Sequence, residues 1–210
     1  GDRPRLGPQW TWEVLPDKDW VSENQRSFQP FAVGPFWVHP SHNAEGIPPA
    51  SIPLRIDAGM AFGTGTHATT RGCLELLATL DPAGTVNAVD VGCGSGVLAI
   101  AALKIGFGPA SAFDFAEASV EAAAENAERN GVELHAWLGD ALRDDLPAAD
   151  IAVANVSLPT VEAVLPRLSV GRVVTSGYLV SEQPVAPGYR HEARRELDGW
   201  AADLFVKATL

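Results

Sequence analysis

The stretch VNAVDVGCGSGVLAIAALKIG, residues 86–106, decides the fold of this chain. Its first residues are mostly apolar and predict a strand over 86–91. Glycines then alternate with Cys93 and Ser95, and the apolar run that follows predicts a helix over 97–105. Glycines between a strand and a helix permit a tight turn and let the main chain approach a ligand closely. The stretch therefore indicates a strand–turn–helix unit with a ligand at its turn.

Strands and helices alternate on both sides of this unit. Further helices are predicted over residues 68–80, 117–130 and 161–168, and further strands over 110–115, 134–138, 151–154 and 172–176. Near the carboxyl end, Asp198 and Gly199 lie between two extended runs and predict a hairpin. This alternation predicts an α/β fold with a doubly wound, mostly parallel sheet, to which the hairpin adds an antiparallel edge.

Composition narrows the class of protein. The chain has 210 residues, 46% of them hydrophobic, and a net charge of -11, which suits a soluble globule. The acidic balance argues against nucleic acid or a membrane surface as partner, and is compatible with a basic protein. Two cysteines, Cys73 and Cys93, give no pairing framework and favour a reduced, cytoplasmic setting. The longest apolar stretch is too short to span a bilayer.

The chain divides into two parts by composition. Residues 1–53 are rich in proline and tryptophan and are expected to form a linker or amino-terminal appendage, with a short extended piece over 36–39. Residues 54–210 carry the strand–helix alternation and are expected to form the ligand-binding domain. The first residue is Gly1 rather than Met, which suggests either a residue left from expression or a truncated fragment that lacks the residues before it.

Acidic residues around the glycine turn indicate which ligand it binds. Asp114 ends the strand after the turn, where a carboxylate can accept hydrogen bonds from both ribose hydroxyls. The spacing beginning at Gly92 and Gly94 is G-x-G-x-G, whereas dinucleotide folds use G-x-G-x-x-G. Asp90, two residues before the first glycine, disfavours a pyrophosphate and suits a cation. S-adenosylmethionine carries an ammonium and a sulfonium, so the charges favour it as cofactor.

The glycine turn has two alternative interpretations. Short-chain reductases need Tyr-x-x-x-Lys, but Tyr178 is followed four places on by Glu182, and Tyr189 by Ala193. The second alternative is a glycine turn with no ligand. The missing Tyr-x-x-x-Lys disfavours the reductase, and the acidic residues that accompany the glycines at strand ends disfavour a turn without a ligand.

Two more strand ends fit a nucleoside site. Asp140 follows the predicted third strand, where its carboxylate can reach an adenine amino group. Asn155 ends the fourth strand, where its side-chain carbonyl can accept a hydrogen bond from an attacking amine; the alternative is a simple strand-end cap. The run from Asn155 to Leu158 lacks the Asn-Pro-Pro-aromatic motif of many enzymes that methylate nucleobase amines, which favours an aliphatic amine as substrate.

The loop GMAFGTGTHATT, residues 59–70, contains no lysine and therefore cannot be a P-loop. Together with its preceding residues it reads IDAGMAFGTGTHATT, which resembles the signature of the ribosomal protein L11 methyltransferase family, PrmA. The segments DVGCGSGVLAIAALKIG, ENAERNGV and VANV resemble the same family. The resemblance runs from about Trp12 to the end. It implies a class I methyltransferase (Rossmann-like) fold that transfers methyl groups from S-adenosylmethionine to protein amines.

The resemblance also implies roles for particular residues. It assigns cofactor contacts to Thr70, Gly92, Asp114 and Asn155, and places Phe62, Thr64 and His67 around the reaction centre. We therefore predict Asn155 and His67 as catalytic residues, with a structural loop histidine as the alternative for His67. The predicted cofactor contacts are Phe62, Thr64, Thr70, Asp90, Gly92, Gly94, Asp114, Asp140 and Asn155. No metal site is expected, since the other histidines form no metal-ligand pattern.

Departures from the family pattern bear on the substrate. The family's amino-terminal substrate-capture domain is expected to be absent, because the chain begins about where the following linker should. The expected function is an S-adenosylmethionine-dependent protein N-methyltransferase acting on a lysine or α-amine of a basic ribosomal protein, without direct nucleic-acid or membrane binding. The alternatives are a methyltransferase for a different protein or a small molecule, and a non-catalytic homologue that only binds the cofactor.

Overall fold

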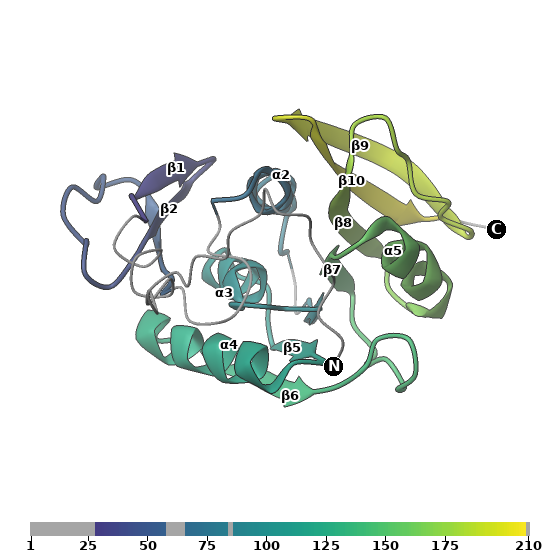
Figure 1. Ribbon diagram of the computed structural model, residues 1–210, viewed down its shortest axis with the longest axis horizontal. Coiled ribbons are helices and arrows are strands. Elements are labelled where there is room, and N and C mark those ends of the chain that lie inside the picture. Colours follow the sequence, from purple (N-terminus) through teal and green to yellow (C-terminus); the bar gives the residue numbers. More distant parts are fainter. Residues whose placement is uncertain (1–27, 58–65, 84–85, 209–210) are drawn as a thin grey trace, which may run out of the picture.

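A seven-stranded sheet forms the centre of the computed structural model, which describes residues 28–57, 66–83 and 86–208 (Figure 1). The strands are β4 (Ala88–Val91), β5 (Ala110–Asp114), β6 (Leu134–Leu138), β7 (Ile151–Asn155), β8 (Arg172–Leu179), β9 (Tyr189–Leu197) and β10 (Trp200–Lys207). Their order is β6-β5-β4-β7-β8-β10-β9. The strands from β6 to β8 run parallel, and β10 is antiparallel to both of its neighbours. The predicted mostly parallel sheet with an antiparallel hairpin edge is confirmed.

Helices cover both faces of this sheet. On one face lie α2 (Ala68–Leu77), α3 (Val97–Lys104) and α4 (Glu117–Asn130), whose apolar side chains pack against the strands (Figure 1). On the other face, α5 (Leu158–Val164) and the 3-10 turn Leu165–Arg167 close a second core. No helix in the described part of the chain is long and apolar enough to cross a membrane.

Some element boundaries match the prediction and others differ; the helix predicted over 68–80 ends at Leu77, three residues before the predicted limit. The helix α4 and the strand β6 have the predicted limits, and Gly131 ends α4 in the left-handed conformation that glycine favours. The helix expected over 161–168 instead begins at Leu158, because Pro159 is tolerated in a first helical turn. The strand predicted over 172–176 continues to Leu179, where it gains a partner in β10.

A smaller sheet of β1 (Phe31–Val33), β2 (Phe36–His39) and β3 (Ile52–Arg55) packs beside α2, α3 and α4. Its apolar residues join the same core as these helices, and the extended piece predicted over 36–39 is β2. The fully buried Asn126 of α4 accepts a hydrogen bond from Asp57 N and donates one to Ser95 O. The division at residue 53 falls within β3 and stays a prediction.

Candidate functional site

A pocket of about 750 Å³ lies at the carboxyl ends of the parallel strands. Each of the strands β4, β5, β6 and β7 contributes to its wall at the residue where it ends or just beyond, and the start of α2 contributes as well. The lining includes Gly92, Gly94, Asp114, Asp140, Asn155 and Trp200. The strand order reverses between β4 and β7, and such a switch point is where open α/β sheets bind ligands.

The glycine turn after β4 folds back over the end of β5. The main-chain N–H groups of Gly92 and Cys93 both donate to Phe113 O, at 2.9 and 3.1 Å. Gly92 has φ of +72°, and a Cβ at this position would lie 2.6 Å from Val156 Cγ1. Only glycine therefore fits here, and its bare main chain forms part of the pocket wall.

The Asp114 carboxylate is held against this turn. One oxygen accepts a hydrogen bond from Gly94 N at 3.0 Å and the other accepts one from Ala116 N at 2.9 Å. The residue is only 8% exposed, yet it lines the pocket. A carboxylate oxygen accepts more than one hydrogen bond, so each can still accept from a ligand hydroxyl.

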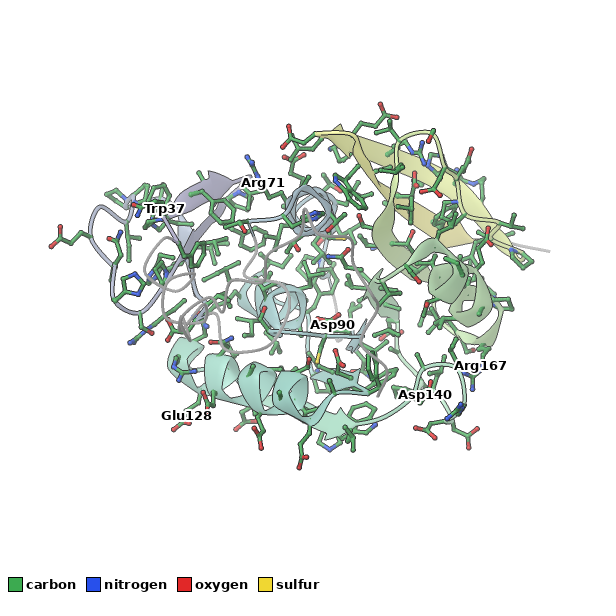
Figure 2. The ribbon with its side chains drawn as sticks, viewed as in Figure 1. Trp37, Arg71, Asp90, Glu128, Asp140 and Arg167 are labelled. Carbon is green, nitrogen blue, oxygen red and sulfur yellow. The ribbon has the colours of Figure 1, made fainter. Side chains whose placement is uncertain are left out.

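Asp90 lies beneath the turn rather than in the pocket wall. It is 2% exposed, and its Oδ2 accepts a hydrogen bond from Ala99 N at 3.1 Å (Figure 2). Burial, together with the nearby Asp114 charge, raises the pKa of Asp90 to about 7, although the Ala99 N–H acts in the opposite direction. Asp90 is not among the described residues that line the pocket, so its contact with a cofactor stays a prediction.

Asp140 lies on the connection after β6, at the periphery of the molecule (Figure 2). Its carboxylate accepts a hydrogen bond from Leu142 N at 2.8 Å and lies 3.4 Å from Arg143 Nε. Arg167 fixes the same connection by donating to the carbonyl oxygens of Ala141 and, at 2.6 Å, Asp144. Asp140 therefore lines the pocket with a carboxylate that is already engaged at the surface.

The α2 end of the pocket carries an amide, a hydroxyl and two rings. Asn155 Nδ2 donates to Thr70 Oγ1 at 3.2 Å, and within the described part of the chain no donor reaches the Asn155 amide oxygen. His67 is the N-cap of α2, with Nδ1 2.8 Å from Thr69 Oγ1. Its ring packs edge-on against Trp200 with the ring centroids 4.9 Å apart.

The structure brings most of the predicted site residues together. The predicted residues that line this pocket are His67, Thr70, Gly92, Gly94, Asp114, Asp140 and Asn155. Phe62 and Thr64 lie outside the described residues. Among the described residues, no group of three or more His, Cys, Asp or Glu side chains is placed to hold a metal ion.

Among the wall residues that sequence reasoning missed are Gly177 and Trp200. Gly177 follows a predicted strand, so its place at a carboxyl end was an available signal. Trp200 begins a strand that runs antiparallel to the others, so its approach to the pocket depends on the insertion of β10 between β8 and β9.

Comparisons with known proteins agree on one family. The family model described as "Ribosomal protein L11 methyltransferase (PrmA)" matches residues 4–202. The chain is 36% identical over 208 residues to the ribosomal protein L11 methyltransferase of Brucella abortus strain S19, which covers 90% of this chain and 73% of that protein. It is 37% identical over 228 aligned residues to the enzyme of the same name from Bordetella bronchiseptica, covering 98% of this chain and 72% of that protein.

A solved structure supports the same grouping. The crystal structure of ribosomal protein L11 methylase from Lactobacillus delbrueckii subsp. bulgaricus matches with a TM-score of 0.76 and 26% sequence identity. The match covers 87% of this chain and 100% of that chain.

Proposed function

The chain belongs to the ribosomal protein L11 methyltransferase (PrmA) family, and on that premise we propose that it methylates an amine of ribosomal protein L11, with S-adenosylmethionine as methyl donor. The observation that carries the proposal is the pocket at the switch point, with a fixed carboxylate at Asp114 and an amide at Asn155. When bound, S-adenosylmethionine supplies an electrophilic methyl group on a sulfonium.

The residues of the glycine turn suit the nucleoside part of this cofactor. The Asp114 carboxylate is fixed by main-chain donors and has acceptor capacity left for ribose hydroxyls. The main chain at Gly92 and Gly94 leaves space that a Cβ at Gly92 would reduce. Asp140 remains a proposed partner for the adenine amino group. An ionised Asp90 beneath the turn would be favoured by a cationic cofactor, because an opposite charge lowers the pKa of a carboxyl.

The α2 end of the pocket suits the reacting groups. Thr70 accepts from the Asn155 amide nitrogen, which leaves the Asn155 oxygen to accept an N–H of the incoming amine. A lysine amine has an ordinary pKa of about 10.4, so it must lose a proton before it attacks. Asn155 orients the neutral amine by this bond, and the proton leaves to water. His67 and the predicted contacts Phe62 and Thr64 complete the proposed reaction centre.

The test combines cofactor binding with methyl transfer. Purified protein is titrated with S-adenosylmethionine by calorimetry, and then incubated with radiolabelled cofactor and purified ribosomal protein L11. Asp114→Asn removes a charged hydrogen-bond acceptor, which should weaken cofactor binding by roughly 10- to 100-fold. The control is Asp145→Asn, which removes an exposed carboxylate outside the pocket and should change neither readout.

Each outcome has a separate meaning. Labelling of ribosomal protein L11 that Asp114→Asn reduces supports both the cofactor and the substrate. Cofactor binding without labelling of that protein contradicts the substrate and leaves the cofactor site in place. A wild-type protein that binds no S-adenosylmethionine refutes the proposal altogether.

A further inference from the structure

Three apolar side chains lie side by side across the strands next to the pocket. Trp200 of β10 pairs in register with Leu179 of β8 on one side and with Leu197 of β9 on the other. Directly opposed residues of antiparallel strands place their side chains on the same face of the sheet. Leu179 is 47% exposed, and the other two are partly exposed. We call these residues the Leu–Trp–Leu row.

The row adjoins the end of the pocket where methyl transfer is proposed. Trp200 lines the pocket and contacts the His67 ring, so the row continues the pocket wall outward across the sheet. Figure 1 shows β8, β9 and β10 beside the helix α2, whose first turn follows His67. A chain lying along the row would therefore have its side chains within reach of the pocket.

Hydrogen bonds hold this apolar surface in place. Leu179 N donates to Glu182 Oε2 at 2.7 Å, and Glu182 O in turn accepts from Arg194 Nη2 at 2.6 Å. Arg194 is itself fixed by the fully buried Asp203, whose Oδ1 lies 2.9 Å from Arg194 Nε. The segment after β8 is thus ordered before any partner binds, which lowers the entropic cost of docking.

A carboxylate lies at each end of the row. Glu182 is bonded to the main chain of Leu179, and the exposed Asp198 directly follows Leu197. The whole chain carries a net charge of -11. Apolar side chains between two carboxylates complement a segment that presents an apolar residue flanked by basic ones.

We propose that the Leu–Trp–Leu row docks the part of the protein substrate next to the methylated amine. The occupant is a polypeptide segment with a large apolar side chain against the row and lysine or arginine near Glu182 and Asp198. This inference rests on the proposed function, because it takes a protein as substrate, and it adds which residues that substrate must carry near its amine.

Substitutions in the row test the docking surface directly. Leu179→Ser and Leu197→Ser should each raise KM for ribosomal protein L11 about tenfold, because each removes a partly buried leucine contact. The turnover number and the affinity for S-adenosylmethionine should stay within twofold of wild type. The matched control is Val185→Ser, since Val185 is 69% exposed on the same connection but lies outside the row. An unchanged KM in both leucine variants overturns the proposal.

Synthetic peptides separate this proposal from the identity of the substrate. Lysine peptides are offered to wild-type protein with the neighbouring residues apolar and basic, apolar and acidic, or polar and basic. We expect the apolar and basic set to be methylated best, and its advantage to shrink in Leu179→Ser and in Glu182→Gln/Asp198→Asn.

The peptide comparison tests the docking surface even if ribosomal protein L11 is not labelled. A lack of labelling of that protein would contradict only the proposed substrate. Peptides methylated without regard to their apolar residue, or not methylated at all, overturn the docking surface. A leucine variant that converts a dimer to a monomer in light scattering, with KM unchanged, identifies the row as a contact between copies and also overturns it.

Discussion

Replacing Gly177 by alanine tests how closely the pocket wall is packed. Gly177 has φ of +105°, and a Cβ there would lie 1.9 Å from the carbonyl oxygen of Val156. Ordinary van der Waals contact for a Cβ begins at 3.4 Å, so the two segments must separate by about 1.5 Å. Val156 directly follows Asn155, and both residues line the pocket. The strain therefore falls on the main chain that positions the proposed catalytic amide.

Two costs add to the expected loss of stability. An alanine at this φ costs about 1–3 kcal/mol, and forcing an extra carbon into a filled space costs about 1–3 kcal/mol more. We expect Gly177→Ala to lower the free energy of unfolding by about 2–6 kcal/mol. A displacement of about 1 Å at a reacting group reduces turnover by roughly 100-fold, so the folded variant should be nearly inactive.

A second glycine separates the steric cost from the conformational one. Gly131 also has a positive φ, of +64°, but a Cβ there would meet nothing within 4 Å. Gly131→Ala should therefore cost only about 1 kcal/mol, and leave methyl transfer unchanged. Urea unfolding measures the stability of both variants, and single-turnover methylation measures their activity. If Gly177→Ala loses no more stability than Gly131→Ala, or keeps full turnover, the close approach to Val156 is not what the pocket depends on.

Three further substitutions address buried polar groups. The folded pKa of Asp90 is about 7 against about 3.9 unfolded, so its contribution is full below pH 4 and is lost as pH rises to 7. The melting temperature of Asp90→Asn should therefore fall less between pH 5 and pH 8 than that of wild type. An equal fall in the two proteins would contradict this. Arg194→Met removes the arginine that pairs with the buried Asp203 carboxylate and should cost about 3–5 kcal/mol in urea unfolding. A cost below about 1 kcal/mol would show that the remaining partners of Asp203, Tyr178 and His191, suffice. Asn126→Leu breaks three hydrogen bonds from the side chain to the main chain of Asp57 and Ser95, and should cost at least about 1–3 kcal/mol by the same measurement. An unchanged free energy of unfolding would show that these bonds do not stabilise the fold.

The local patterns of the sequence predicted most of the fold. The strand–turn–helix unit at β4 and α3 was recognisable because its apolar runs and glycines act over neighbouring residues. The place of Asp114 at the end of β5 followed from the same reasoning, since carboxyl ends of parallel strands meet at one edge. These features depend on contacts close in the sequence or on the parallel order of strands.

The remaining features depend on contacts between distant segments. The contact of Asp90 with a cationic ligand stays a prediction; the bond of its carboxylate to Ala99 N depends on how α3 packs and leaves no signal in the local sequence. Trp200 reaches the pocket only because β10 inserts between β8 and β9 in reverse direction. A hairpin signal at Asp198 and Gly199 indicates a turn, but it does not say which strand becomes the edge.

The insertion of β10 also bears on when the pocket forms during protein synthesis. The start of α2 and the glycine turn, which contribute to the pocket, are translated long before Trp200, which supplies part of the wall beside His67. A ribosome-bound chain that ends before β10 has neither this wall nor the partner strand of β8. The pocket is therefore completed late in translation, and a nascent chain lacks the complete surface on which we place its substrate.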